Sequence, residues 1–342
     1  MFKFSRPLRT TALLACLSSP LFAQVIEPPN VRDTARFRFL VAGHAYGSHR
    51  GDNLGLHPPL VAKLHAGAFG KLDFIVFTGD VLRRFEQESW ASLTKELRPL
   101  GCKYYITPGN HDVTDFGSVR LREAYGSLHY RFDVGTTRFV FLNTQEVSRT
   151  IPPGQLLFLR AALKESEGIG AFLVFFHELI WLAKKPHYKT IRANSRSRQN
   201  KLGKSNYWRD IHPLLVQQAP RPVFVIAGDV AGNADAIPAF KDQVDNVSLI
   251  ASGMGEVKGE NALVVTVDGS NVAVNLHCLD GSDPRLLDYY TPANLNSLPR
   301  DAFRRTPPPG SSRDWLIALI AVGIVGIGAL IAMVRRRRPV ER

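Results

Sequence analysis

Four apolar segments of the chain each run directly into polar residues of types that bind metal ions. Short apolar runs without a polar face are typical of buried strands in a parallel sheet. The carboxyl ends of parallel strands meet at one edge of an open α/β sheet, where ligands bind. We therefore expect an α/β fold with a polar site at this edge. The segments are residues 72–77 before Asp80, 104–107 before Asn110, 171–176 before His177 and 222–226 before Asp229.

The tetrapeptide Gly109-Asn110-His111-Asp112 is the densest of these polar sets. It places an amide oxygen, an imidazole and a carboxylate on one tight turn after a strand. Gly, Asn and Asp are also common in surface turns, so the tetrapeptide alone leaves a turn without function open. Its occurrence together with three other strands that end in such residues favours a site for metal ions and phosphate.

These motifs resemble the ordered signature of the calcineurin-like metallophosphoesterase superfamily. That signature consists of Asp-x-His, Gly-Asp, Gly-Asn-His-Asp or -Glu, a single His, and Gly-His-x-His, and the resemblance extends over residues 36–280. The residues that match in type and order are Asp80, Asn110, His111, Asp112 and His177. The resemblance implies a two-sheet β-sandwich flanked by helices, with a metal centre that hydrolyses phosphate esters.

The first and last motifs depart from the family pattern. After the expected strand over residues 37–41, the best register puts His44 in place of the Asp and Tyr46 in place of the His. A shifted register keeps His44 as the motif's His, and neither register contains the Asp. In the last motif Asp229 replaces the first His and Ala231 the second. His44 and Tyr46 are therefore either metal ligands or the lining of an altered pocket.

The resemblance implies two adjacent metal ions that share Asp80. Two-metal sites hold their ions about 3.5–4 Å apart and clamp the attacking and leaving oxygens. An oxygen-rich shell with imidazole suits Mn, Fe or Zn, and we expect one or two such ions. The first ion would take Asp80, Asn110, His177 and Asp229, and the second His44, Tyr46 and Asp80.

His111 and Asp112 are the candidate catalytic residues. The resemblance implies that His111, held by Asp112, protonates the leaving group, and imidazole titrates in the range that this role needs. The expected substrate is a phosphomonoester or a phosphodiester, with a lipid-linked ester as one alternative. A non-catalytic binding or scaffold protein stays open, because Ala231 and the missing first Asp remove ligands. The intact His111–Asp112 pair favours the enzyme.

The body of the chain is expected over residues 36–285. Strands alternate with helices near residues 58–69 and 86–97, which indicates parallel βαβ units. A hairpin is expected at residues 129–142, and strands dominate after residue 229. Residues 289–314 are rich in Pro and Arg and predict an extended linker.

Both ends of the chain are typical of an exported membrane protein. Residues 1–23 have a basic start and a modest apolar stretch, which predicts a signal peptide, with a lipoprotein signal at Cys16 as the alternative. Residues 315–334 carry no charge and are long enough to cross a bilayer as a helix. The basic tail at residues 335–342 predicts a cytoplasmic C-terminus, with the body periplasmic or extracellular.

Positive charge gathers between His177 and Asp229. The chain has a net charge of +13, and residues 184–204 contain eight Lys or Arg and no acidic residue. Such a loop near the site mouth could attract an anionic substrate or anionic lipid, or could simply be solvated. It lacks the aromatic platform of a nucleic-acid surface, so no nucleic-acid partner is expected.

Two cysteines, Cys102 and Cys278, remain outside the expected signal peptide. In an oxidising compartment they could form one disulfide. Two separate thiols are equally consistent with the sequence, so both alternatives stay open.

Overall fold

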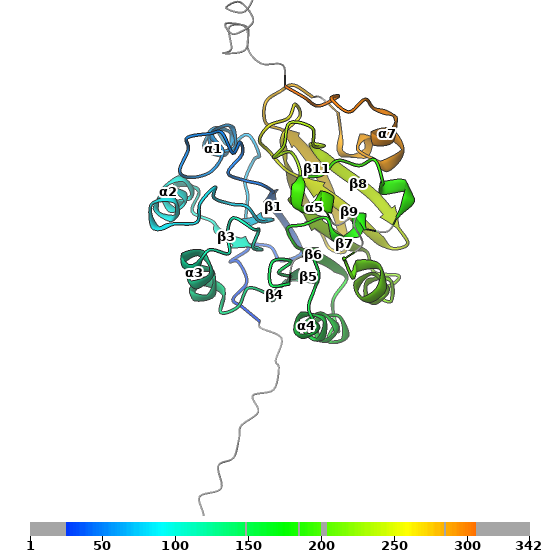
Figure 1. Cartoon of the computed structure of the whole chain (residues 1–342). Helices are drawn as coiled ribbons and strands as arrows, with labels where there is room; N and C mark the ends of the chain where they lie inside the picture. The colour runs from blue at the N-terminus through cyan, green and yellow to red at the C-terminus, as the bar shows by residue number, and fades with distance from the viewer. Residues whose placement is uncertain (1–24, 148, 184, 200–203, 284, 306–342) are drawn as a thin grey trace, which may run out of the picture. The chain divides into compact units, whose positions relative to one another are not determined.

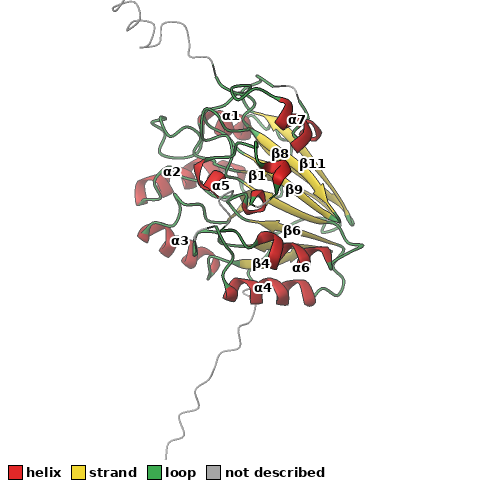
Figure 2. Cartoon of the chain, turned by 45° about the vertical axis from the view of Figure 1, so that its right-hand side comes forward, coloured by secondary structure: helices red, strands yellow, loops and turns green. Residues whose placement is uncertain are grey.

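The computed structural model describes residues 25–305, except residues 148, 184, 200–203 and 284. Two β-sheets pack face to face, with helices on the outside (Figures 1 and 2). This architecture confirms the expected α/β sandwich flanked by helices. The expected signal peptide, membrane helix and cytoplasmic tail lie outside the described residues. Among the residues that the structure describes, no helix has the length and apolar character that crossing a bilayer requires.

The first sheet has the strand order β11-β10-β1-β2-β3. Its middle strands β1, β2 and β3 run parallel, and β10 and β11 form an antiparallel extension. The helices α1, α2 and α3 lie together beyond this sheet (Figure 1). The bounds are β1 Arg36–Ala42, α1 Pro58–His65, β2 Phe74–Phe77, α2 Gln87–Leu97, β3 Lys103–Ile106, α3 Asp115–Tyr125, β10 Asn261–Asp268 and β11 Asn271–Cys278.

The second sheet has the strand order β4-β5-β6-β7-β9-β8. Strands β5, β6, β7 and β9 run parallel, and the antiparallel strands β4 and β8 close its two edges. The expected hairpin is confirmed as β4 and β5. The bounds are β4 Tyr130–Val134, β5 Thr137–Phe141, α4 Pro153–Lys164, β6 Ala171–Phe175, α5 Ser195–Gln199, α6 His212–Val216, β7 Val223–Ala227, β8 Ala239–Val244, β9 Val247–Ser252 and α7 Pro292–Ser297.

Aromatic rings from both sheets meet in the core. Phe39 of β1 stacks on Phe74 of β2, with ring centroids 4.7 Å apart. Phe139 of β5 contacts both rings edge-on, at 5.3 Å and 5.5 Å. Such pairs contribute about 0.5–1.5 kcal/mol each beyond the area that they bury. This packing holds the two sheets together and so fixes the relative positions of their strand ends.

Part of the expected linker belongs to the folded body. The first compact unit of the chain ends at Phe303, well beyond residue 285. Tyr290 is fully buried, accepts a hydrogen bond at its carbonyl from the Lys241 amide, and donates its hydroxyl to Asp283. Leu295 and Phe303 are also buried. The expectation of an extended linker from residue 289 is therefore wrong up to residue 303, because these few apolar side chains pack against the body.

The two cysteines are free thiols. Cys102 directly precedes β3 and Cys278 ends β11, so they belong to opposite edges of the first sheet. Neighbouring strands lie about 4.7–4.9 Å apart, so the two edges are separated by far more than a disulfide can span. The structure thus resolves the open alternative in favour of two separate thiols.

Candidate metal centre

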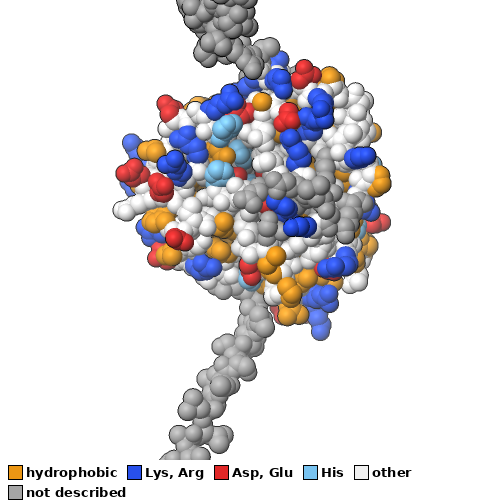
Figure 3. Space-filling view, in the orientation of Figure 1, with side chains coloured by type: hydrophobic (Ala, Val, Ile, Leu, Met, Phe, Trp, Pro, Cys, Tyr) orange, Lys and Arg blue, Asp and Glu red, His pale blue; other side chains and the backbone are white. Residues whose placement is uncertain are grey.

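The ends of five parallel strands supply the side chains of the site. His44 and Tyr46 follow β1, and Asp80 follows β2. Asn110 and His111 follow β3, and His177 and Asp229 follow β6 and β7. The predicted residues converge on one cavity of about 240 Å³. Figure 3 shows pale-blue histidine side chains at one place on this face, with Lys and Arg around it. The lining of the cavity includes His44, Tyr46, Asp80, Asn110, His111 and Asp229. Asp112 and His177 are fully buried and do not appear in the lining.

Asp80, His177 and Asp229 form the tightest group of candidate ligands. One ligand atom from each lies within 4.8 Å of the others. The Nε2 atom of His177 is 3.3 Å from Asp80 Oδ2 and 3.8 Å from Asp229 Oδ1. The turn before Asp80 needs a glycine, because a Cβ atom on Gly79 would lie 2.5 Å from the His177 ring. This close packing brings the ends of β2 and β6 together.

The imidazole of His177 is oriented as metal-ligating histidines are. Its Nδ1 atom lies 2.9 Å from the carbonyl oxygen of Thr78 and donates to it. Its Nε2 atom is buried, faces the carboxylates of Asp80 and Asp229, and makes no well-aligned hydrogen bond within the described residues. In metal-ligating histidines, a hydrogen bond from the ring nitrogen that does not bind the metal fixes the tautomer and the ring orientation. The donor set of the triad therefore fits a divalent cation.

The electric field at the triad favours a cation. Burial lowers the pKa of His177, but the negative charges of Asp80 and Asp229 outweigh it and raise the pKa to about 10. Burial likewise opposes ionisation of Asp80, yet the imidazoles of His177 and His44 hold the pKa of its carboxyl well below the usual value. The same field that stabilises a proton here would stabilise a metal ion.

Asp229 is held in place by α5. The backbone N–H and the hydroxyl of Ser197 both donate to Asp229 Oδ2, at 2.8 Å and 2.6 Å. This leaves Oδ1 directed toward His177. Asn194 donates its backbone N–H to the carbonyl of Asp229, and Asn194 and Ser195 also line the cavity. The basic segment between His177 and Asp229 therefore contributes to the site. Its Ser197 and Asn194 could not be recognised as site residues from the sequence, because they belong to no known motif.

His44 also faces the carboxylate of Asp80. Its Nδ1 donates to the carbonyl of Met254 at 3.1 Å, which leaves Nε2 3.8 Å from Asp80 Oδ2. Burial lowers the pKa of His44 and so favours its neutral, ligating form. His44 Nε2 is therefore turned toward the carboxylate of Asp80. Ala231 adds no side-chain donor.

Tyr46 packs between two histidines. Its ring centroid is 4.3 Å from that of His44 and 4.9 Å from that of His111. Its hydroxyl lies 3.4 Å from His111 Nε2. Burial raises the pKa of Tyr46 above its usual value, so the phenol stays protonated near neutral pH. The structure therefore places Tyr46 as a hydrogen-bond partner of His111.

The expectation that Asp112 holds His111 is wrong. His111 Nδ1 donates instead to the carbonyl of Arg83, at 2.7 Å. The carboxylate of Asp112 is fully buried and points to the backbone, where it accepts the N–H groups of Asp80, Gly109 and Val81 at 2.7–3.0 Å. Burial raises the pKa of Asp112 to about 6, with a further contribution from Asp80. Asp112 thus fixes the backbone that carries Asp80.

We expect Asp112→Ala to lower the free energy of unfolding by about 3–5 kcal/mol, because several buried N–H groups lose their acceptor. Urea denaturation followed by circular dichroism measures the change. Asp112→Asn is the matched control, since it keeps one carbonyl oxygen of the same shape and should cost less. A loss below about 1 kcal/mol in Asp112→Ala would contradict this structural role.

Comparisons with known proteins point to one family. A sequence model of the family described as calcineurin-like phosphoesterase matches residues 49–253. A protein of Coxiella burnetii (strain RSA 493 / Nine Mile phase I), named as a probable cyclic nucleotide phosphodiesterase, is 26% identical over 129 residues. That alignment covers 36% of this chain and 52% of the relative, so the chain matches about half the relative's length. The chain belongs to the calcineurin-like phosphoesterase family, whose members depend on metal ions.

Proposed function

We propose that this protein is a metal-dependent hydrolase of phosphomonoesters or phosphodiesters. The observation that carries the proposal is the buried Nε2 of His177, which faces the carboxylates of Asp80 and Asp229 and makes no well-aligned hydrogen bond in the part of the chain that the structure describes. A buried polar atom without a partner is costly unless something binds it. The cavity above the triad gives a substrate access to it.

The residues present fit an ion that prefers oxygen and imidazole ligands. Asp80, His177 and Asp229 would hold it, and Asn110 lies at the same cavity with an amide oxygen. Mn, Fe and Zn suit such a shell. When bound, an ion of this kind supplies Lewis-acid polarisation of the phosphoryl oxygens. A second ion would have His44 and the shared Asp80.

In this proposal His111 would move a proton at the leaving oxygen. Its Nδ1–H is fixed on the Arg83 carbonyl, so Nε2 is the atom presented to the cavity. The hydroxyl of Tyr46 lies beside that nitrogen and can donate to it. Since Asp112 contacts the backbone instead, the orientation of His111 depends on Arg83 and Tyr46.

The name of the Coxiella relative supports a diester as the first substrate class to examine. The second candidate is a binding or scaffold protein with an incomplete metal site. It is favoured by Ala231 and by the thin ligand set around His44. Both candidate functions are compatible with a bound ion at the triad. They differ in that only the hydrolase turns over a phosphate ester.

Hydrolysis of chromogenic esters tests the proposal. Purified protein is loaded in turn with Mn, Fe or Zn and assayed with bis(4-nitrophenyl) phosphate and 4-nitrophenyl phosphate. We expect turnover of at least one ester, its loss with a chelator, and its return when metal is restored. A retained ion without turnover of either ester under any loading would favour the binding protein.

We further propose that the body is exported and anchored to a membrane, with residues 315–334 as the anchor and residues 335–342 cytoplasmic. The support is the uncharged apolar run followed directly by four arginines. Residues 1–23 would direct export. An anchored body would work beside the bilayer surface, which is why a lipid-linked phosphate ester remains a candidate substrate.

We expect a chain that ends at residue 305 to be soluble and folded, whereas the full chain sediments with membranes. A chain that ends at residue 288 is the matched comparison, and it should unfold at lower urea because Tyr290, Leu295 and Phe303 are buried. Fractionation followed by urea denaturation measures both effects. Membrane association of the chain that ends at residue 305 would show that another segment anchors the protein.

A further inference from the structure

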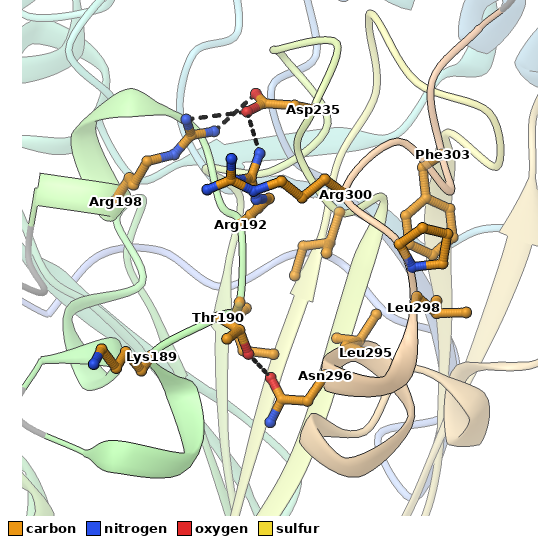
Figure 4. A pocket seen from close by; sticks show the side chains of 13 residues that line it. Lys189, Thr190, Arg192, Arg198, Asp235, Leu295, Asn296, Leu298, Arg300 and Phe303 are labelled. Carbon is orange, nitrogen blue, oxygen red and sulfur yellow. Dashed lines mark hydrogen bonds and ion pairs between the residues drawn. The ribbon is translucent and has the colours of Figure 1, made fainter.

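A second cavity, of about 440 Å³, lies beside α7. Pockets for small organic ligands have volumes of about 300–1,000 Å³. Its walls come from three parts of the chain, namely residues 189–198, residues 235–237 and residues 295–303 (Figure 4). Residues 192–198 also contribute to the metal centre, so the two cavities share this segment.

The cavity carries more positive than negative charge. Asp235 is the one acidic residue among the described residues of the lining. It accepts hydrogen bonds from Arg192 at 2.7 Å and from Arg198 at 2.9 Å and 3.3 Å. Lys189 and Arg300 add two further positive charges to the lining. Figure 4 shows the guanidinium groups gathered near Asp235, with Arg300 reaching in from the segment after α7.

The other side of the cavity is apolar. Leu295 and Phe303 are less than a tenth exposed, as are Ile191 and Ile237, and all four line the cavity. In Figure 4, Leu295, Leu298 and Phe303 lie apart from the arginines. One wall therefore suits an apolar group, while the opposite wall suits an anion.

The alternative is that the arginines only fasten residues 189–198 to the loop of Asp235. Arg192 and Arg198 are sufficient for that task, since both already bind the carboxylate. Arg300 is exposed and has no acidic partner among the described residues. Fastening the loop therefore does not account for Arg300. An anion would give Arg300 a partner, since guanidinium groups bind phosphate, sulfonate and carboxylate through paired N–H groups.

We propose that this cavity binds a small organic anion, in which an apolar ring or chain carries a phosphate, sulfonate or carboxylate. The apolar part would lie against Leu295 and Phe303, and the charged part would meet Arg300 and Arg192. This site does not depend on the proposed hydrolase activity, because none of these side chains belongs to the candidate metal ligands.

Isothermal titration of the full-length protein with 2-naphthalenesulfonate tests this site, after subtraction of the heat with the solubilising carrier alone. The probe combines a flat apolar body with an anion and cannot be hydrolysed as a phosphate ester. We expect saturable binding, and a rise in Kd of about tenfold or more in Arg300→Gln, because a hydrogen bond to a charged group is lost. Methanesulfonate lacks the apolar body, so its Kd for the wild-type protein should be higher than that of 2-naphthalenesulfonate by about tenfold or more.

Two variants serve as controls. Arg36→Gln removes an exposed arginine that pairs with Asp268 on the first sheet, and it should leave Kd unchanged. Asp80→Asn should bind the probe as wild type does, which separates this site from the metal centre. If Arg300→Gln and Arg36→Gln have the same Kd, or if Asp80→Asn abolishes binding, the proposal is overturned. Binding that depends on Arg300 supports it even if no phosphate ester is hydrolysed.

Discussion

Asp80→Asn is expected to remove the bound metal and the hydrolytic activity together. Asp80 Oδ2 lies 3.3 Å from His177 Nε2 and 3.8 Å from His44 Nε2, so both candidate ion positions depend on its charge. Its other oxygen accepts the backbone N–H of His111 at 3.0 Å, which asparagine can retain. Losing the charge stabilisation that an ion supplies costs several kcal/mol, which corresponds to about 10³-fold in rate.

Metal content by mass spectrometry and turnover on the same samples measure this effect. Asp52→Asn is the matched control, because Asp52 is exposed and lies outside the cavity lining. It should keep both the metal and the activity of the wild type. Wild-type metal content in Asp80→Asn would show that the triad is not the ligand set.

His111→Ala is expected to lower turnover by about 10²–10⁴-fold, the range of general acid–base catalysis. Its metal content should stay at the wild-type level, because Nδ1 is bound to the Arg83 carbonyl and Nε2 lies beside the Tyr46 hydroxyl. The separation of turnover from metal content is what distinguishes His111 from Asp80.

Steady-state kinetics under saturating metal measure this change. His65→Ala is the matched control, since His65 is exposed and its Nε2–H donates a hydrogen bond to the Glu96 carbonyl, away from the cavity. Full activity in His111→Ala would mean that another group, with Tyr46 as the nearest, protonates the leaving oxygen. Parallel loss of metal in His111→Ala would instead make His111 a ligand.

The strands and the main polar residues could be predicted because both depend on local sequence. An apolar run followed by Asp80 or His177 predicts a parallel strand that ends at a site, and the strand order then brings these residues together. The contacts of Asp112 and His111 could not be predicted in this way. These contacts depend on how the turns after β2 and β3 pack. The partners of Asp112 and His111 are backbone groups, which a sequence motif does not reveal.

The contribution of Ser197 was missed for a related reason. Ser197 lies in a segment whose evident feature is its charge, and only the folded chain brings it to Asp229. The packing of residues 289–303 was missed because Tyr290, Leu295 and Phe303 are scattered among polar residues. Their spacing follows neither a strand period nor a helix period, so burial could not be read from the sequence.

A metal titration with activity measured in each sample tests the central claim most directly. Metal-stripped protein receives increasing Mn or Zn, and bound metal and hydrolysis of the ester that the protein turns over are followed together. The account predicts no turnover in stripped protein, and turnover that rises with bound metal and saturates at one or two ions per chain. Turnover that persists in fully stripped protein, or an absence of stoichiometric metal binding, would contradict it.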